Sequence, residues 1–226
     1  MGAGTGSYEP ANRHVVAVEP SDVMLGQRAV GAAPAIRAVA EHLPFPDSAA
    51  EAVLAVLTVH HWAEWRSGLD ELRRVAPLRV VLTYDPLRHM EQWLIREYVP
   101  EVAEVEAGRP RFDQVCERLG ASSIIELPMS RDFSDGVMGA FWCRPHAYLD
   151  PRVRQHMSGL ALLPEEVVGP AMRRLADNLA SGSWAREHRD LLHAPEYDAG
   201  FRLVISRDWP CLPSAPLFHL VAAHSS

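Results

Sequence analysis

The sequence has few cysteines and no pair of them at short spacing. The three, Cys116, Cys143 and Cys211, are far apart and odd in number. A disulfide framework needs an even set, and a zinc knuckle needs cysteines in close pairs. We therefore expect neither, and a reducing cytoplasm is the simplest setting.

The sequence also lacks a positively charged start followed by an apolar run, and no stretch approaches the roughly 18 apolar residues of a membrane span. No signal peptide and no membrane partner are expected. Basic residues are not in excess, since 22 Lys and Arg stand against 29 Asp and Glu, for a net charge of −7. Nucleic-acid binding needs a basic face that neutralises phosphates, so no nucleic-acid partner is expected.

The 226 residues are 48% hydrophobic, which is enough for the core of one domain. Short apolar runs alternate with helical patterns over residues 1–85. The expected strands are 14–18, 35–40, 52–57 and 79–84, and the expected helices are 22–30 and 67–75. This alternation predicts an α/β fold: a Rossmann-like, doubly wound, mostly parallel sheet with helices on both faces.

The second half of the chain has a different pattern. Residues 86–200 are rich in helical segments broken by prolines and are expected to form a lid or cap on the substrate side. Within them, residues 112–119 are expected to form a helix ended by Gly120, and 123–127 a strand. Residues 201–226 are expected to supply an antiparallel last strand and a tail. We therefore expect a single domain over 1–226, with 1–85 as its cofactor-binding half.

Three glycines at alternate positions open the chain, in Gly2-Ala3-Gly4-Thr5-Gly6. Glycine allows backbone angles and close approaches that side chains prevent. A loop of this kind between a strand and a helix cradles a nucleoside-type cofactor. Glu19, at the end of the next expected strand, can accept both hydroxyls of a ribose. The spacing is not the dinucleotide fingerprint GxGxxG, and the Gly-Lys-Ser or Gly-Lys-Thr of a P-loop is absent.

Two further stretches follow the glycine loop in order, Val15-Val16-Ala17-Val18-Glu19-Pro20-Ser21 and Leu43-Pro44-Phe45-Pro46-Asp47. With these, the chain resembles a class I S-adenosylmethionine-dependent methyltransferase, most closely the small-molecule subgroup that has a Leu-Pro-Phe-x-Asp loop. The resemblance covers residues 1–85, and residues 86–226 match only the architecture.

The resemblance implies S-adenosylmethionine as cofactor, S-adenosylhomocysteine as product and a small molecule as methyl acceptor. The glycines would pass under the methionine and ribose parts, and Glu19 would bind the ribose hydroxyls. Pro20 and Met24 would lie along the adenine, while Ala40 would offer it a backbone N–H. The implied cofactor residues are Gly2, Gly4, Gly6, Glu19, Pro20, Met24, Ala40, Glu41, Thr58 and Val59.

The chain departs from the family pattern at two places. Val39 stands where the family usually has an acidic residue for the adenine amino group. The chain also begins inside the glycine motif, so the first, central strand is expected to be missing. A gene start placed too late and a truncated chain are both open explanations. Loss of that strand would leave backbone groups of its neighbours unpaired.

His60-His61-Trp62 follows an expected buried strand at the ligand-binding edge. A histidine there can take a proton from the acceptor, so His60 and His61 are the candidate catalytic residues. Adjacent residues of an extended chain point to opposite sides, so at most one of the two is expected to face the acceptor. The alternative is that they pack or cap the next helix. No third ligand stands at a recognisable spacing, so no metal is expected.

The aromatic residues of the second half have two open interpretations. They could wall an apolar acceptor pocket, or they could form the core of the cap. They are Trp93, Tyr98, Phe141, Trp142, Tyr148 and Trp184.

Three functions remain open at this level. The first is a small-molecule methyltransferase. The second is a catalytically impaired relative that binds nucleosides or assembles with other proteins. A nucleotide-linked oxidoreductase fits the glycine spacing and the Leu43–Asp47 loop less well. The sequence leaves a homodimer open.

Overall fold

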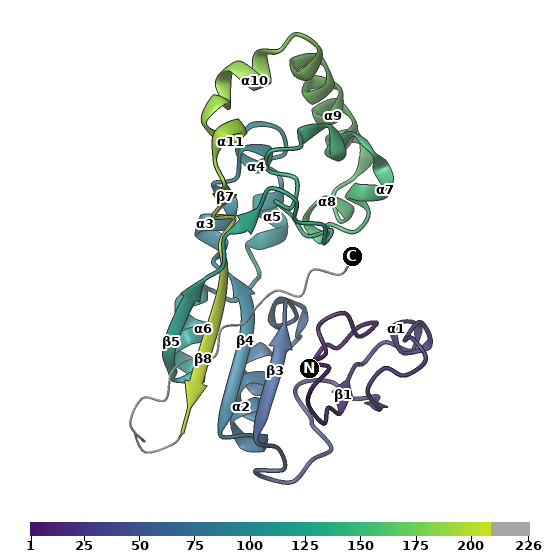
Figure 1. Ribbon diagram of the computed structural model, residues 1–226, viewed down its shortest axis with the longest axis vertical. Coiled ribbons are helices and arrows are strands. Elements are labelled where there is room, and N and C mark those ends of the chain that lie inside the picture. The colour runs from purple at the N-terminus through teal and green to yellow at the C-terminus, as the bar shows by residue number, and fades with distance from the viewer. Residues whose placement is uncertain (209–226) are drawn as a thin grey trace.

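The computed structural model describes residues 1–208, and the expected tail with Cys211 lies outside this range. The centre of the fold is a four-stranded sheet of order β3-β4-β8-β5 (Figure 1). Its strands are β3 (Ala52–Val56), β4 (Leu78–Tyr84), β5 (Ala121–Glu126) and β8 (Phe201–Arg207). β3 and β4 are parallel, whereas β8 runs antiparallel to both of its neighbours. The expected antiparallel last strand is therefore confirmed.

A second, two-stranded parallel sheet consists of β1 (Ala17–Val18) and β2 (Ala35–Ile36). Both strands are shorter than expected. The preceding residue Val16 is 54% exposed, so only Ala17 and Val18 of the expected strand 14–18 are buried and paired.

Residues 1–3 lie between the two sheets. The Ala3 N–H donates to the Val18 carbonyl over 3.1 Å, and the Met1 nitrogen donates to the Leu54 carbonyl over 2.7 Å. β1 belongs to one sheet and β3 is the edge strand of the other, and within residues 1–208 no strand pairs with both of them. The start of the glycine loop thus bridges the last residue of β1 and the middle of β3.

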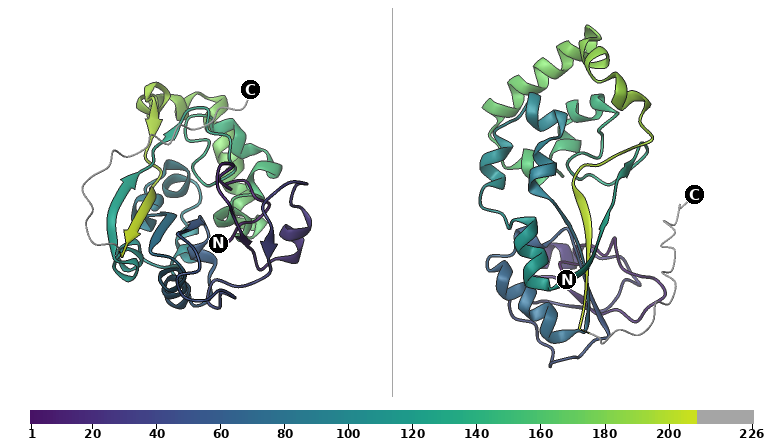
Figure 2. Two further views of the ribbon diagram at one scale, coloured as in Figure 1. Left: turned by 60° about the horizontal axis from the view of Figure 1, so that its bottom comes forward. Right: turned by 90° about the vertical axis from the view of Figure 1, so that its left-hand side faces the viewer.

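Two helices, α2 (Trp65–Val75) and α6 (Phe112–Leu119), lie against the same face of the sheet (Figure 2). The expected helix face is confirmed, because Leu69, Leu72 and Val75 of α2 are at most 3% exposed. α6 ends at Gly120, whose φ of +67° is the left-handed conformation that favours glycine at a helix end. The short helix α1 (Asp22–Gly26) begins at Ser21, whose hydroxyl accepts the Met24 N–H over 3.3 Å.

The remaining helices form a cap at the carboxyl end of β4 (Figure 1). They are α3 (Pro86–Met90), α4 (Trp93–Glu97), α5 (Val102–Glu106), α7 (Pro151–Arg154), α8 (Ser158–Ala161), α9 (Glu165–Ala180), α10 (Ser183–Glu187) and α11 (Arg189–His193), with the 3-10 helix η2 (Pro145–Leu149). The strands β6 (Met129–Ser130) and β7 (Glu196–Tyr197) join the cap to the sheet half. No helix in the described part of the chain is long and apolar enough to span a membrane.

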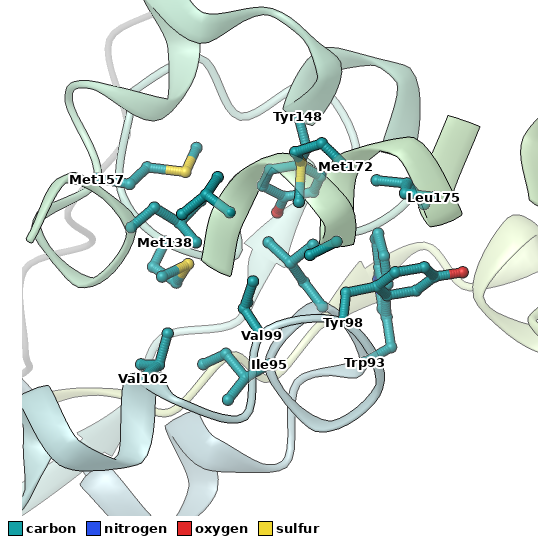
Figure 3. Packing of buried hydrophobic residues seen from close by; sticks show 14 of the residues in the cluster. Trp93, Ile95, Tyr98, Val99, Val102, Met138, Tyr148, Met157, Met172 and Leu175 are labelled. Carbon is teal, nitrogen blue, oxygen red and sulfur yellow. The ribbon is translucent and has the colours of Figure 1, made fainter. Parts of the chain in front are cut away.

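The cap has an apolar core of its own (Figure 3). Trp93, Tyr98, Tyr148 and Trp184 are at most 5% exposed and belong to this core. Trp93 contacts each of the other three ring to ring, with centroids 5.0 to 5.9 Å apart. For these four aromatic residues the core interpretation is therefore the correct one.

Candidate cofactor and acceptor site

The three glycines of the first loop have left-handed backbone angles. Gly2, Gly4 and Gly6 have φ values of +60°, +52° and +101°. A side chain is strained in this region, so the loop requires glycine. A Cβ atom on Gly2 would lie 2.1 Å from Oγ1 of Thr58. The glycine loop therefore packs directly on the segment that follows β3.

Glu19 directly follows β1 and links the glycine loop to the start of α1. Its Oε2 accepts the Gly4 N–H over 2.9 Å, and its Oε1 accepts the Ser21 N–H over 3.0 Å. The residue is 7% exposed. Each carboxylate oxygen keeps a further lone pair, so Glu19 can still accept the two hydroxyls of a ribose. The glycine cradle and this carboxylate thus fit a nucleoside cofactor.

Arg28, which no sequence motif indicated, holds the glycine loop through a hydrogen bond to its backbone. Arg28 donates to the Gly4 carbonyl over 3.3 Å and to the Ala33 carbonyl over 2.9 Å, and it forms an ion pair with Glu9. Glu9 also accepts the Ala33 N–H over 3.0 Å. No motif marks Arg28 and Glu9, because they are 19 residues apart and only the folded loop joins them.

The Leu43–Asp47 loop is held by α2. Glu71 accepts the Leu43 N–H over 2.8 Å. Arg74 donates to the carbonyls of Phe45 and Leu43 over 2.7 and 3.2 Å and pairs with Asp47. Hydrogen bonding to Arg74 lowers the pKa of Glu71. The proline-rich loop thus owes its fixed position to two charged residues of the neighbouring helix.

The residues implied for the adenine side differ in exposure. Pro20 and Met24 are exposed, with Met24 at 42%, while Ala40 is 5% exposed. Glu41 accepts the Glu64 N–H over 3.2 Å and so faces the residue before α2. Val39, in the place of the family's acidic residue, is 43% exposed.

The segment after β3 is a short 3-10 helix, η1 (Val59–His61), rather than extended chain. Thr58 precedes it, and its hydroxyl accepts the indole N–H of Trp62 over 3.1 Å. Val59 is 1% exposed. The expectation that adjacent histidines diverge is wrong here, because it assumed extended backbone. The rings of His60 and His61 lie with their centroids 4.0 Å apart.

His60 faces the end of β4. Its ring centroid lies 5.2 Å from that of Tyr84, edge to face. The buried Nδ1 of His60 has no hydrogen-bond partner within residues 1–208. Burial, together with the charges of His61, Arg109 and His89, lowers the pKa of His60 to about 2. His60 is therefore a neutral imidazole at physiological pH.

A buried polar cluster joins β4 to the cap. The Tyr84 hydroxyl donates to Oε2 of Glu106 over 2.8 Å and accepts Nη1–H of Arg109 over 2.8 Å. Glu106 and Arg109 also pair with each other at 3.3 Å, and their side chains are 6% and 10% exposed. Burial raises the pKa of both Tyr84 and Glu106. The sequence offered only one signal for this cluster, a tyrosine at the end of a strand.

His89 of α3 completes the surroundings of Tyr84. The two ring centroids are 4.8 Å apart, and His89 is 5% exposed. Its Nδ1 accepts the side-chain N–H of Gln92 over 2.8 Å. Burial lowers the pKa of His89 to about 4. A second neutral imidazole thus lies beside the cluster.

A group with metal-ligand chemistry occurs elsewhere, in the cap. Glu97, Glu187 and His188 offer ligand atoms within 4.8 Å of one another. His188 already bonds the Trp184 carbonyl through Nδ1 and Glu97 through Nε2, at 2.9 and 3.2 Å. These two hydrogen bonds at the end of α10 account for the arrangement, and the group does not belong to the candidate site.

The family model of a methyltransferase domain matches residues 1–77. Among solved structures, the chain is 30% identical to a proposed methyltransferase of an antibiotic biosynthesis pathway from Anabaena variabilis. That match covers 91% of this chain and 88% of the other at a TM-score of 0.83. The YcgJ protein of Bacillus subtilis shares the fold at 13% identity, with 92% and 90% coverage and a TM-score of 0.50. No curated protein matches significantly. The chain belongs to the class I S-adenosylmethionine-dependent methyltransferases.

Proposed function

We propose that the enzyme transfers the methyl group of S-adenosylmethionine to a small molecule, which would be held where the cap meets the sheet half. The Tyr84–Glu106–Arg109 cluster carries this proposal. In this cluster the buried side chains of Glu106 and Arg109 bond to Tyr84 at the end of β4, and the ring of Tyr84 lies beside His60. Thr58, two residues before His60, touches the glycine loop. The segment from Thr58 to His61 thus contacts both the glycine loop and the end of β4, where the cap begins.

A second set of residues fits S-adenosylmethionine. The left-handed glycines leave room for the methionine and ribose parts, and Glu19 would accept the ribose hydroxyls. Pro20 and Met24 are exposed and would lie along the adenine, to which Ala40 would offer its backbone N–H, with Glu41 beside it. Thr58 and Val59 would border the methionine through their backbone. The bound cofactor supplies an activated methyl group on a sulfonium.

Methyl transfer asks little more of the protein than orientation, which alone can supply most of the acceleration. We assign different roles to the two histidines. His60 is too weak a base at a pKa of about 2 and would instead exchange a hydrogen bond with the acceptor through its unpartnered Nδ1. His61 is the more exposed of the two and would take the proton of the acceptor.

The acceptor is expected to be small for two reasons. The Glu106 and Arg109 side chains, bonded to the hydroxyl of Tyr84 beside His60, are at most 10% exposed, which leaves little access for a folded macromolecule. The net charge of −7 also disfavours a nucleic acid.

The size of the acceptor is tested with methyl-labelled S-adenosylmethionine and an extract of the source organism, separated by ultrafiltration into small-molecule and macromolecular fractions. Label is expected in the small-molecule fraction only. Label in protein or RNA would contradict the proposal.

The impaired alternative is tested without an acceptor. Isothermal titration of the folded chain with S-adenosylhomocysteine is expected to show saturable binding. A folded sample that releases no heat and gains no thermal protection would exclude a working cofactor site.

A further inference from the structure

A side-chain hydrogen bond joins the glycine loop to the cap. The hydroxyl of Tyr8, which follows Gly6 closely in the chain, donates to the carboxylate of Asp135. The two residues are 127 positions apart, and Asp135 lies in the cap between β6 and η2. Both are exposed, Tyr8 at 47%. The bond lies at the surface, where the N-terminal segment beside β3 faces the cap above it (Figure 1).

The backbone around Tyr8 is held within the N-terminal region. The Glu9 N–H donates to the Gly6 carbonyl over 3.3 Å. The Glu9 carboxylate pairs with Arg28, and Arg28 donates to the Gly4 carbonyl over 3.3 Å. A pull on Tyr8 is therefore transmitted to the glycine loop itself.

Asp135 belongs to a cap segment, residues 133–137, that also reaches the ends of the central strands. Phe133 and Val137 are half-buried and pack against the apolar cluster that contains Tyr84 of β4. The segment thus contacts the glycine loop at one residue and the acceptor side of the sheet at two others. It extends across the boundary between the cofactor half and the cap.

Leu57 lies under the same boundary. It directly follows β3 and has a φ of +49°, which is uncommon for a bulky side chain. Its side chain packs against the same cluster as Phe133 and Val137, while the next residue, Thr58, faces the glycine loop. Strained backbone of this kind clusters at functional sites, where the surrounding structure holds it in place.

We propose that residues 133–137 form a lid over the junction of the cofactor and acceptor sites, and that the bond between Tyr8 and Asp135 holds the lid closed. A closed lid excludes water and keeps the methyl donor and the acceptor in place during transfer. Release of S-adenosylhomocysteine then requires this bond to break. The acceptor side of the inference rests on the proposed function, whereas the hold on the cofactor loop does not.

The first test is a double-mutant cycle on the release of S-adenosylhomocysteine from the full chain, measured by surface plasmon resonance. Tyr8→Phe and Asp135→Ala are each expected to speed release about two- to tenfold, the usual effect of losing one hydrogen bond. The double variant should be no faster than either single one, because all three lack the same bond. Tyr197→Phe is the matched control, since it removes a hydroxyl at β7 and keeps the ring that stacks on Trp142. Unchanged release, or effects that add in the double variant, would overturn the proposal.

The second test needs no ligand. Hydrogen exchange is followed by mass spectrometry in peptides that cover residues 131–137. Tyr8→Phe is expected to speed exchange there, because the lid opens more often, and Tyr197→Phe is not. Equal exchange in Tyr8→Phe and the parent chain would show that Tyr8 does not hold the lid. If S-adenosylhomocysteine does not bind at all, the cofactor site itself fails, and hydrogen exchange still decides whether the bond closes the lid.

Discussion

The carboxylate of Glu19 accepts the backbone N–H of Gly4 on one side and that of Ser21 on the other, over 2.9 and 3.0 Å. One side chain thus fixes both the glycine loop and the first turn of α1 before any ligand arrives. Charge-assisted hydrogen bonds of this kind are among the stronger ones in proteins. Glu19 would therefore order the loop as well as contact the cofactor.

Glu19→Gln is expected to weaken binding of S-adenosylhomocysteine by about 10- to 100-fold, because a neutral amide replaces a charged acceptor. Isothermal titration measures the affinity. Glu51→Gln, at an exposed position, is the control and should leave it unchanged. If the two variants bind alike, Glu19 has no part in the cofactor site.

Gly2→Ala is expected to abolish measurable cofactor binding. The new Cβ would be placed 2.1 Å from Oγ1 of Thr58 on a backbone with φ of +60°, so the loop must move. Such a strained left-handed residue costs about 1–3 kcal/mol. Gly26→Ala is the matched control, since a Cβ there meets no atom within 4 Å. Thermal unfolding with and without S-adenosylhomocysteine compares the two variants, and ligand protection retained by Gly2→Ala would contradict the prediction.

The sequence predicted most of the sheet half because its elements follow local rules. Apolar runs marked β3 and β4, and Gly120 marked the end of α6. The supports of the site could not be predicted, since each joins residues far apart in the chain. Arg28 reaches back to Gly4, and Arg109 reaches Tyr84 from beyond the end of α5. The extended backbone predicted at His60 was also wrong. A 3-10 turn after a strand is only three residues long, too short to show a periodic pattern in the sequence.

The two histidines of η1 are expected to respond differently to substitution. His61→Ala should slow methyl transfer to the native acceptor by about 10²-fold or more, a typical contribution of a general base. His60→Asn should raise KM more than it lowers kcat, because His60 is proposed to contribute a hydrogen bond rather than basicity. Initial rates with labelled cofactor and the small-molecule fraction of the extract separate these effects. Unchanged turnover of His61→Ala would remove the base role.

His89 is expected to make folding stability depend on pH. Burial lowers its pKa from 6.5 to about 4 in the folded chain. Above pH 6.5 neither state carries the proton. Between the two values the unfolded chain binds a proton that the folded chain does not. The free energy of unfolding should therefore fall as the pH falls, by about 1.4 kcal/mol per pH unit and about 3 kcal/mol across the window. His60 acts in the same direction down to about pH 2.

His89→Asn isolates the contribution of this one histidine. The amide oxygen of asparagine can stand where Nδ1 accepts the Gln92 side-chain N–H, so the hydrogen bond is kept while the titration is lost. Urea unfolding across the window should show a shallower pH dependence for this variant than for the parent chain. His14→Asn, at an exposed position, should follow the parent. Parallel curves for His89→Asn and the parent would mean that His89 has the same pKa in the folded and the unfolded chain, which would contradict a pKa lowered by burial.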